Sequence, residues 1–312
     1  MLKNVPDYEG LNNAALSQYF FAWERTLSIE SVFQEAHFDE ETYEEERIKY
    51  VEQSQRDLRV YYTIIQQSNE LALKARLCRV SPYLLLIGSE NRFSFNTEDI
   101  EFSDLRTLNA VDLIGAVNSL TEQTLSSEFQ TLYNALRVRR NAMLHLDASL
   151  EVLDPDDVLH TLIKIYLELW PERNWLADRV LFGSHSSDAY FDDGENFTIL
   201  GSVIREWSTI YHILTKGEFK NLFGISKSQR RYICFQCLQE AKTDWDDWDF
   251  SEVKFAYLIN EDNLHCLICD SNFQVTRKPC AVDHDCEGDV ISHANEDFAE
   301  QCHTCSYHPS EI

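Results

Sequence analysis

The sequence predicts a mainly α-helical protein, in which a helical bundle is followed by a small cysteine-rich domain of α/β or β structure. Only 9 glycines and 6 prolines occur among 312 residues, so few turns are signalled. Apolar residues recur three and four positions apart through most of the chain before residue 217, which is the period of a helix. Eight of the nine cysteines lie between positions 234 and 305. We therefore expect a helical domain at 1–225, with its core at 10–180 and a further helix at 197–216, and a cysteine-rich domain at 226–312.

The composition and the net charge of the chain restrict the class of protein. An apolar content of 44% is enough for a proper core. No apolar run follows Lys3 and no stretch approaches the roughly 18 apolar residues of a membrane span, so we expect a cytoplasmic protein with no membrane partner. A net charge of −26 argues against broad, sequence-independent nucleic-acid binding and suits a protein that binds a basic partner.

Two long helices are expected first, at 11–38 and 41–78, each with a broad apolar face. Glu70 is expected to pair with Lys74 at i,i+4, and a contact between Glu70 and Arg140 across the bundle is the weaker alternative. Cys78, far from every other cysteine, is expected to be a buried free thiol.

Pro82 ends the second helix and a short buried segment follows. Residues 88–104 are predicted to form a polar loop or a short strand pair, and 105–120 a shorter helix.

The helix predicted at 125–147 carries an unusual set of side chains. Ser126 and Ser127 are suited to cap its start. Near its other end lie three arginines, an amide and an imidazole: Arg137, Arg139, Arg140, Asn141 and His145. An imidazole moves protons near neutral pH, and a guanidinium stabilises charge on a phosphate oxygen. These are the minimum groups for cleaving RNA without a metal.

The hexad from Arg140 to His145 resembles the Arg-x(4 to 6)-His signature of HEPN domains, in which a polar residue usually follows the arginine. The looser pattern also occurs from Arg179, Arg205 and Arg277, but only at Arg140 does Asn follow the arginine in a well-formed helix. The preceding segment from Ser68 to Leu86 is similar to the HEPN helix before the motif helix. The resemblance covers roughly residues 10–180.

HEPN domains are small helical bundles, and many are ribonucleases of defence and toxin systems that dimerise so that two motifs face each other. The resemblance implies that His145 is the general acid or base, that Arg140 stabilises the phosphorane-like charge, and that Asn141 orients the phosphate or Arg140. Arg137 and Arg139 would hold flanking phosphates. It also implies a homodimer, RNA as substrate, a 2′,3′-cyclic phosphate product and no catalytic metal. In one toxin subgroup, a tyrosine two positions after the histidine is modified by a partner nucleotidyltransferase; Asp147 stands there, so that regulation is not expected.

Beyond the motif, Asp154 is expected to cap a helix running to about Phe182, which Pro171 is expected to kink or split. Residues 183–196 are polar and are the first linker candidate. After the helix at 197–216, the basic run at 227–231 introduces the cysteines.

The cysteine spacing indicates zinc. Three CxxC pairs and one Cys-x5-Cys pair occur in a chain with no export signal, which favours tetrahedral metal sites over disulfides. The simplest pairing is sequential, and an alternative joins the second CxxC pair to Cys280 and Cys286. His284, His293 or His303 could replace a thiolate. Complete sulfur ligation leaves no open position, so two structural zinc ions are expected on Cys234, Cys237, Cys266, Cys269, Cys280, Cys286, Cys302 and Cys305.

The residues between the first two CxxC pairs suggest what this region contacts. The acidic, aromatic segment 243–250 is expected to dock onto the helical domain, because its carboxylates would repel a phosphate backbone. Residues 255–259 are expected to form a strand of a zinc ribbon, and its acidity favours a protein partner.

The sequence therefore predicts a metal-independent HEPN-type endoribonuclease with a zinc-ribbon module. The rival hypothesis is a non-catalytic dimerisation scaffold that binds a protein partner, such as an antitoxin, through its acidic surface and zinc ribbon. A zinc-dependent hydrolase is disfavoured, because no His and carboxylate cluster with an open ligand position is evident.

Overall fold

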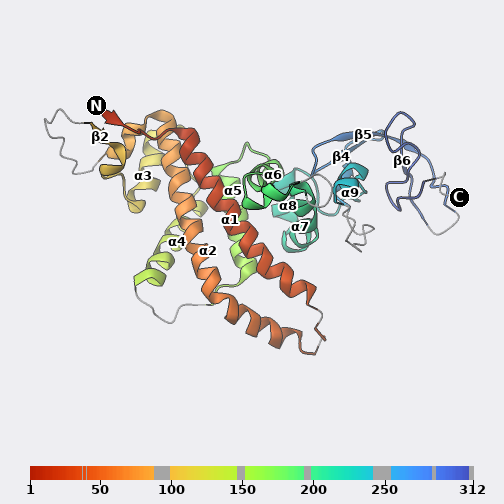
Figure 1. Ribbon diagram of the computed structural model, residues 1–312, viewed down its shortest axis with the longest axis horizontal. Coiled ribbons are helices and arrows are strands. Elements are labelled where there is room, and N and C mark those ends of the chain that lie inside the picture. Colours follow the sequence, from red (N-terminus) through yellow and green to blue (C-terminus); the bar gives the residue numbers. More distant parts are fainter. Residues whose placement is uncertain are drawn as a thin grey trace. The chain divides into compact units, whose positions relative to one another are not determined.

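The computed structural model describes residues 1–36, 38–39, 41–87, 99–145, 152–192, 198–241, 254–282 and 286–308. The chain divides into two compact units, Met1–Glu172 and Arg173–Ile312 (Figure 1). The first is mainly helical, and the second combines helices with a four-stranded antiparallel sheet. The mainly α class with a small β-containing C-terminal part is confirmed. The helices at 175–223 group with the cysteine-rich region, and independent folding of 226–312 stays a prediction.

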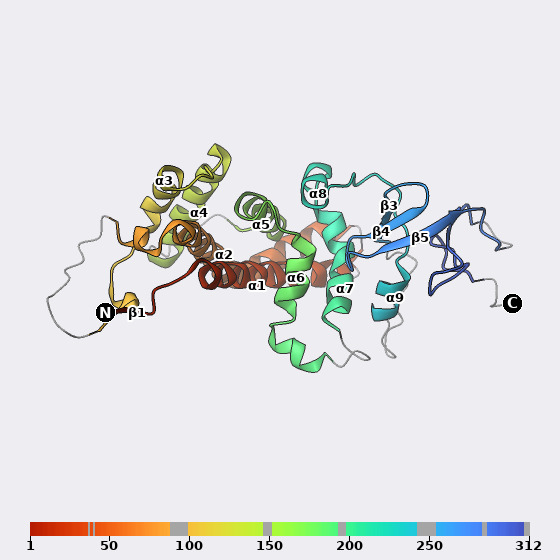
Figure 2. The ribbon, with the colours of Figure 1, turned by 90° about the horizontal axis from the view of Figure 1, so that it is seen from above.

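Two long antiparallel helices, α1 (Tyr8–Glu35) and α2 (Tyr43–Val80), form the centre of the first unit (Figures 1 and 2). The carboxylate of Asp7 caps α1 by accepting the Gly10 N–H at 2.7 Å. Three glutamates in the first turn of α2 suit its dipole, and Pro82 follows its end. Their core includes the fully buried Tyr19, Trp23, Phe33, Leu58 and Ile65. Both predicted helices are confirmed, with ends within three residues of the expected positions.

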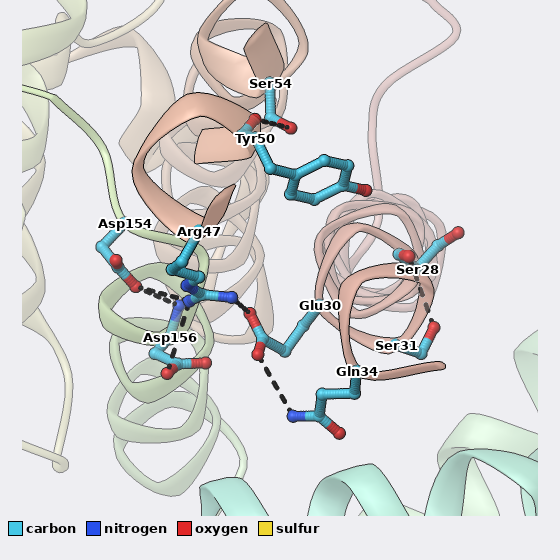
Figure 3. Close-up of polar contacts among 9 residues, drawn as sticks. All are labelled: Ser28, Glu30, Ser31, Gln34, Arg47, Tyr50, Ser54, Asp154 and Asp156. Carbon is cyan, nitrogen blue, oxygen red and sulfur yellow. Dashed lines mark hydrogen bonds and ion pairs between the residues drawn. The ribbon is translucent and has the colours of Figure 1, made fainter. Parts of the chain in front are cut away.

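An ion cluster closes the hairpin near its turn (Figure 3). The guanidinium of Arg47 lies 2.5 Å from the buried Glu30 carboxylate, 3.5 Å from Asp154 and 3.7 Å from Asp156. Burial, and then the negative charge of Glu30, raises the pKa of Asp156 to about 6, although Arg47 opposes the shift. Three carboxylates thus share one cation where α1, α2 and the start of the helix α5 (Pro155–Leu169) meet.

The described part of the connection from α2 to the next long helix is built from short elements. It contains η1 (Pro82–Leu86), β2 (Ile100–Glu101), η2 (Phe102–Asp104) and α3 (Ala110–Leu120). Strand β2 pairs in parallel with β1 (Leu2–Lys3). Part of the predicted polar loop, 88–98, lies outside the described residues. Cys78 is buried and unpaired, as predicted, and burial raises the pKa of its thiol to about 11.

Helices α4 (Ser127–His145) and α5 (Pro155–Leu169) complete the first unit. The Ser126 hydroxyl accepts the Phe129 N–H at 3.2 Å, and the Ser126 N–H and O–H both donate to Glu168 of α5. The apolar face of α4, with Phe129, Tyr133 and Leu136, is buried. The helix predicted from 155 to 182 is split at Trp170–Asn174, as the proline at 171 led us to expect.

Among its described residues, the second unit begins with the α-helices α6 (Trp175–Gly183), α7 (Ile199–Ile213), α8 (Lys216–Phe223) and α9 (Phe235–Ala241). Short strands follow: β3 (Ala256–Leu258), β4 (Asn263–Cys266), β5 (Asn272–Arg277) and β6 (Val290–Ser292), paired in that order. Tyr257 of β3 and Phe219 of α8 have ring centroids 6.4 Å apart, and Phe219 also packs on Trp207 of α7. This aromatic core joins the helices to the sheet.

Candidate functional site

The last three turns of α4 hold the residues that the sequence singled out. Arg137, Arg139, Arg140 and Asn141 all lie in this segment and are half-buried. The backbone of His145 ends α4, but its side chain lies outside the described residues, as does Asp147. The structure therefore brings the arginines and the amide together on one helix and does not test the position of the imidazole.

Arg140 reaches across to α2. Its Nη2 donates to Oε1 of Glu70 at 2.6 Å, and the two side chains are 24% and 21% exposed. Glu70 also accepts from Nε2 of Gln66, one turn earlier on α2, at 3.2 Å. Lys74 donates to the Thr107 hydroxyl. The expected pairing of Glu70 with Lys74 is thus replaced by the contact with Arg140, because packing places α4 against this face of α2.

The neighbouring arginines also turn toward α2 or into the helix interface. The guanidinium of Arg139 lies 5.6 Å from the centroid of the Tyr62 ring, a cation–π distance. Nε of Arg137 is buried without a hydrogen-bond partner among the described residues. Burial, and then the charge of Glu70, raises the pKa of Tyr133, whose O–H donates to the Ala110 carbonyl. The end of α4 is therefore a half-buried cationic surface set around one carboxylate.

The eight C-terminal cysteines form two groups of four, Cys234, Cys237, Cys266 and Cys269, and then Cys280, Cys286, Cys302 and Cys305. Within each group the four sulfur atoms lie within 4.8 Å of one another. The sequential pairing is confirmed, and the alternative pairing is not found. The first group joins the start of α9 to the turn after β4, and the second joins the loops on either side of β6.

The sulfur spacing fits a tetrahedral metal. The distances between sulfur atoms are 3.8 Å (Cys234 and Cys269), 3.6 Å (Cys237 and Cys266), 3.7 Å (Cys280 and Cys305) and 4.0 Å (Cys286 and Cys302). A zinc–sulfur bond of about 2.3 Å in a tetrahedron places the sulfurs about 3.8 Å apart. A disulfide would need about 2.0 Å. Each group can therefore hold one zinc ion.

The backbone packs closely around the sulfur atoms of the second cysteine group. The Gly288 N–H faces the sulfur of Cys286 at 3.3 Å, and the Thr304 N–H faces that of Cys302 at 3.4 Å, contacts that stabilise thiolates. A Cβ at position 288 would lie 2.9 Å from the Cys302 sulfur and 2.8 Å from the Thr304 side chain. Only glycine, which has no Cβ, allows the backbone at position 288 to lie this close to Cys302 and Thr304.

The predicted histidine substitutes for thiolates are not used at the described positions. His303 is buried, with Nδ1 2.7 Å from the Ile233 carbonyl and Nε2 2.9 Å from the Ser292 hydroxyl. Both ring nitrogens are engaged away from the sulfurs, and burial lowers the pKa of His303 to about 4. Nδ1 of His293 accepts the Asn295 N–H, and His284 lies outside the described residues. His303 instead joins the residue before Cys234 to the second cysteine group.

No family model matches the chain. The searches of curated proteins and of solved structures returned no match either. In the part of the chain that the structure describes, we find no helix with the length and apolar content needed to cross a lipid bilayer.

Proposed function

We propose that the chain is a metal-independent endoribonuclease of the HEPN type, with its chemistry at the end of α4. The observation that carries the proposal is the contact between Arg140 and Glu70. It holds the motif arginine against the preceding long helix through Nη2 alone, and Nε and Nη1 form no hydrogen bond with a described residue. A guanidinium held in this way keeps donors for a phosphate oxygen and needs little reordering when RNA binds.

In the proposed reaction, the ribose 2′-oxygen attacks the adjacent phosphorus and the 5′-oxygen leaves. His145 takes the 2′-hydroxyl proton or gives a proton to the leaving oxygen, and Arg140 stabilises the charge on the pentacoordinate phosphorus. Asn141 orients the phosphate or Arg140, while Arg137 and Arg139 hold flanking phosphates. Each chain supplies one Arg140–His145 pair, so a homodimer provides the second proton-transfer group.

The two cysteine groups have a structural role in this proposal. Four thiolates around each zinc leave no position for water, and the zinc ions hold α9 and the small sheet together in a reducing compartment such as the cytoplasm. Metal analysis of purified protein should give two zinc ions per chain. A placement in a defence or toxin system rests only on the HEPN resemblance.

A second candidate is a non-catalytic scaffold that dimerises through the helices and binds a protein partner through its acidic surface. Two observations favour it. The net charge of −26 opposes RNA approach. The contacts of Arg139 with Tyr62 and of Arg140 with Glu70 are also those of arginines that only join two helices.

Cleavage of labelled single-stranded RNAs and total tRNA separates the two candidates. Wild type, Arg140→Ala and His145→Ala are compared with brief addition of EDTA, since prolonged chelation would remove structural zinc. The ribonuclease proposal expects cleavage by wild type and a loss of at least about 100-fold in His145→Ala. Absence of cleavage by folded, zinc-loaded wild type supports the scaffold. Equal cleavage by all three proteins would show that the catalytic site does not lie on α4.

A further inference from the structure

Five cations follow the end of α7 within the C-terminal unit. We call Lys216, Lys220, Lys227, Arg230 and Arg231 the basic cluster. From residue 219 to 239 the chain has no aspartate or glutamate, although these make up 53 of its 312 residues. The local sign of charge is therefore opposite to that of the whole chain.

Packing around Tyr211 of α7 brings Lys227 and Arg231 together, and Lys216 is close enough for its charge to act on Lys227. The Tyr211 hydroxyl donates to the Lys227 carbonyl at 2.8 Å, and Nζ of Lys227 donates to the Leu214 carbonyl at 2.6 Å. The Arg231 guanidinium lies 3.7 Å from the centroid of the Tyr211 ring, and Nζ of Lys227 lies 4.7 Å from it. Burial, followed by the charge of Arg231 and more weakly by that of Lys216, lowers the pKa of Lys227, although the charge of Glu218 opposes the shift. The cations are thus close enough to repel one another.

The chain's own carboxylates leave much of this charge unbalanced. Among the described residues, no carboxylate forms an ion pair with Lys216, Lys220 or Arg231. Glu218 lies nearby, but it accepts from the N–H and O–H of Thr215 in the capping box of α8. The ion pair of Arg230 with Asp289 is long, at 3.9 Å, and the Arg230 side chain is half exposed. Elsewhere the structure pairs cations closely, as in Arg140 with Glu70 and Arg179 with Glu206.

This arrangement suits a phosphate chain. Stacking on Tyr211 uses the face of the Arg231 guanidinium and fixes its plane, while its N–H donors in that plane remain able to bind phosphate oxygens. Lys216 and Lys220 are exposed on α8. A flexible single strand can follow so small a cluster, whereas a rigid duplex would bring further phosphates toward the acidic surface. A single strand is therefore the better fit.

We propose that the basic cluster binds the phosphate backbone of single-stranded RNA and holds the substrate of the ribonuclease. The identity of the RNA as substrate rests on the proposed function, but the binding site itself does not. The cluster supplies the contact that the net charge of the chain otherwise opposes.

The test measures binding separately from cleavage. Fluorescence anisotropy of labelled oligouridine is followed against KCl concentration, with full-length, zinc-loaded His145→Ala protein as the reference. The test variant combines Lys216→Gln, Lys220→Gln and Arg231→Gln. At low salt its Kd should rise by at least about tenfold, and the slope of log Kd against log salt should fall by about 2, since each phosphate contact to a single strand contributes about 0.7.

The matched control removes the same total charge from paired positions. Lys3, Lys49 and Lys278 lie 52%, 54% and 45% exposed beside their own carboxylate partners, and all three are changed to Gln. This variant should bind the RNA within about twofold of the reference, because screened distant charges contribute little. Arg231→Lys, which keeps the charge but not the fork of donors, should weaken binding while leaving the slope unchanged.

Equal weakening in the two triple variants would mean that only total charge matters and would overturn the proposal. Unchanged binding in the test variant would also overturn it, as would equally tight binding of a duplex of the same length. If wild type fails to cleave RNA but the test variant still loses binding, the ribonuclease function fails and the RNA site stands. If wild type cleaves RNA but the test variant binds it unchanged, the ribonuclease function stands and the RNA site fails.

Discussion

The contact between Arg140 and Glu70 can be tested by a double-mutant cycle of protein stability. The charges lie about 4 Å apart when measured between group centres, and at an effective dielectric constant of about 20 their attraction is about 4 kcal/mol. Both side chains are about three-quarters buried, so desolvation offsets much of this energy. We expect a net coupling energy of about 1.5 kcal/mol, between the values for exposed and fully buried pairs.

The cycle uses Glu70→Gln, Arg140→Gln and the double variant, with unfolding free energies from urea titrations followed by circular dichroism. Each single variant leaves the other charge largely buried without its partner, so the single losses should sum to more than the loss in the double variant. Glu70→Gln combined with Lys74→Gln is the control, because Lys74 donates to Thr107. Its coupling should be below about 0.3 kcal/mol. A larger coupling to Lys74 than to Arg140 would refute the packing of α4 on α2 derived above.

Three further predictions concern the zinc groups and the ion cluster. Cys266→Ser should lower bound zinc from two ions to one per chain and loosen the C-terminal unit, measured by metal analysis and circular dichroism; two retained ions would contradict the first group. Gly288→Ala should cost about 1–3 kcal/mol and speed zinc release to a chromogenic chelator, whereas Gly217→Ala, with open space around its Cβ position, should not. Because the folded pKa of Asp156 is raised to about 6, its protonation stabilises the fold below pH 4 and this gain is lost as the pH rises to 6. Asp156→Asn should therefore stabilise the protein at pH 8 by no more than about 1 kcal/mol, since the side chain is 45% exposed and screened, and should give no gain at pH 4; an equal gain at both values would contradict the assignment.

The local sequence pattern was sufficient to predict most of the helices and the two cysteine groups. The apolar period over residues 8–80 defines α1 and α2 because each buries one long face. The sequential pairing predicted from the cysteine spacing is also found: the Tyr232–Ala256 bridge and the pairing of Ala256 with Cys266 bring the first two CxxC pairs together.

Contacts between distant elements were harder to predict. Glu70 and Arg140 are 70 positions apart, and which side chains meet depends on the relative rotation of α2 and α4. The i,i+4 rule therefore favoured Lys74, a pair that contributes only a few tenths of a kcal/mol. Likewise, the basic run at 227–231 is visible in the sequence, but the contacts of Lys227 and Arg231 with Tyr211 require the fold-back after α8.

The role of His303 also could not be predicted from the sequence. Its position inside the last CxxC pair made it a candidate ligand, yet both ring nitrogens bond to Ile233 and Ser292. Spacing alone cannot distinguish a metal ligand from a buried histidine whose hydrogen-bond partners lie far away in the sequence.

The central claim concerns the chemistry at the end of α4, and the ends of the RNA products test it most directly. Wild-type protein is incubated with a labelled single-stranded RNA during brief chelation, and the new ends are identified by mass spectrometry. The proposal predicts 2′,3′-cyclic phosphate and 5′-hydroxyl ends that disappear with His145→Ala and Arg140→Ala. Products with 5′-phosphate ends, or cyclic ends that persist in both variants, would contradict it.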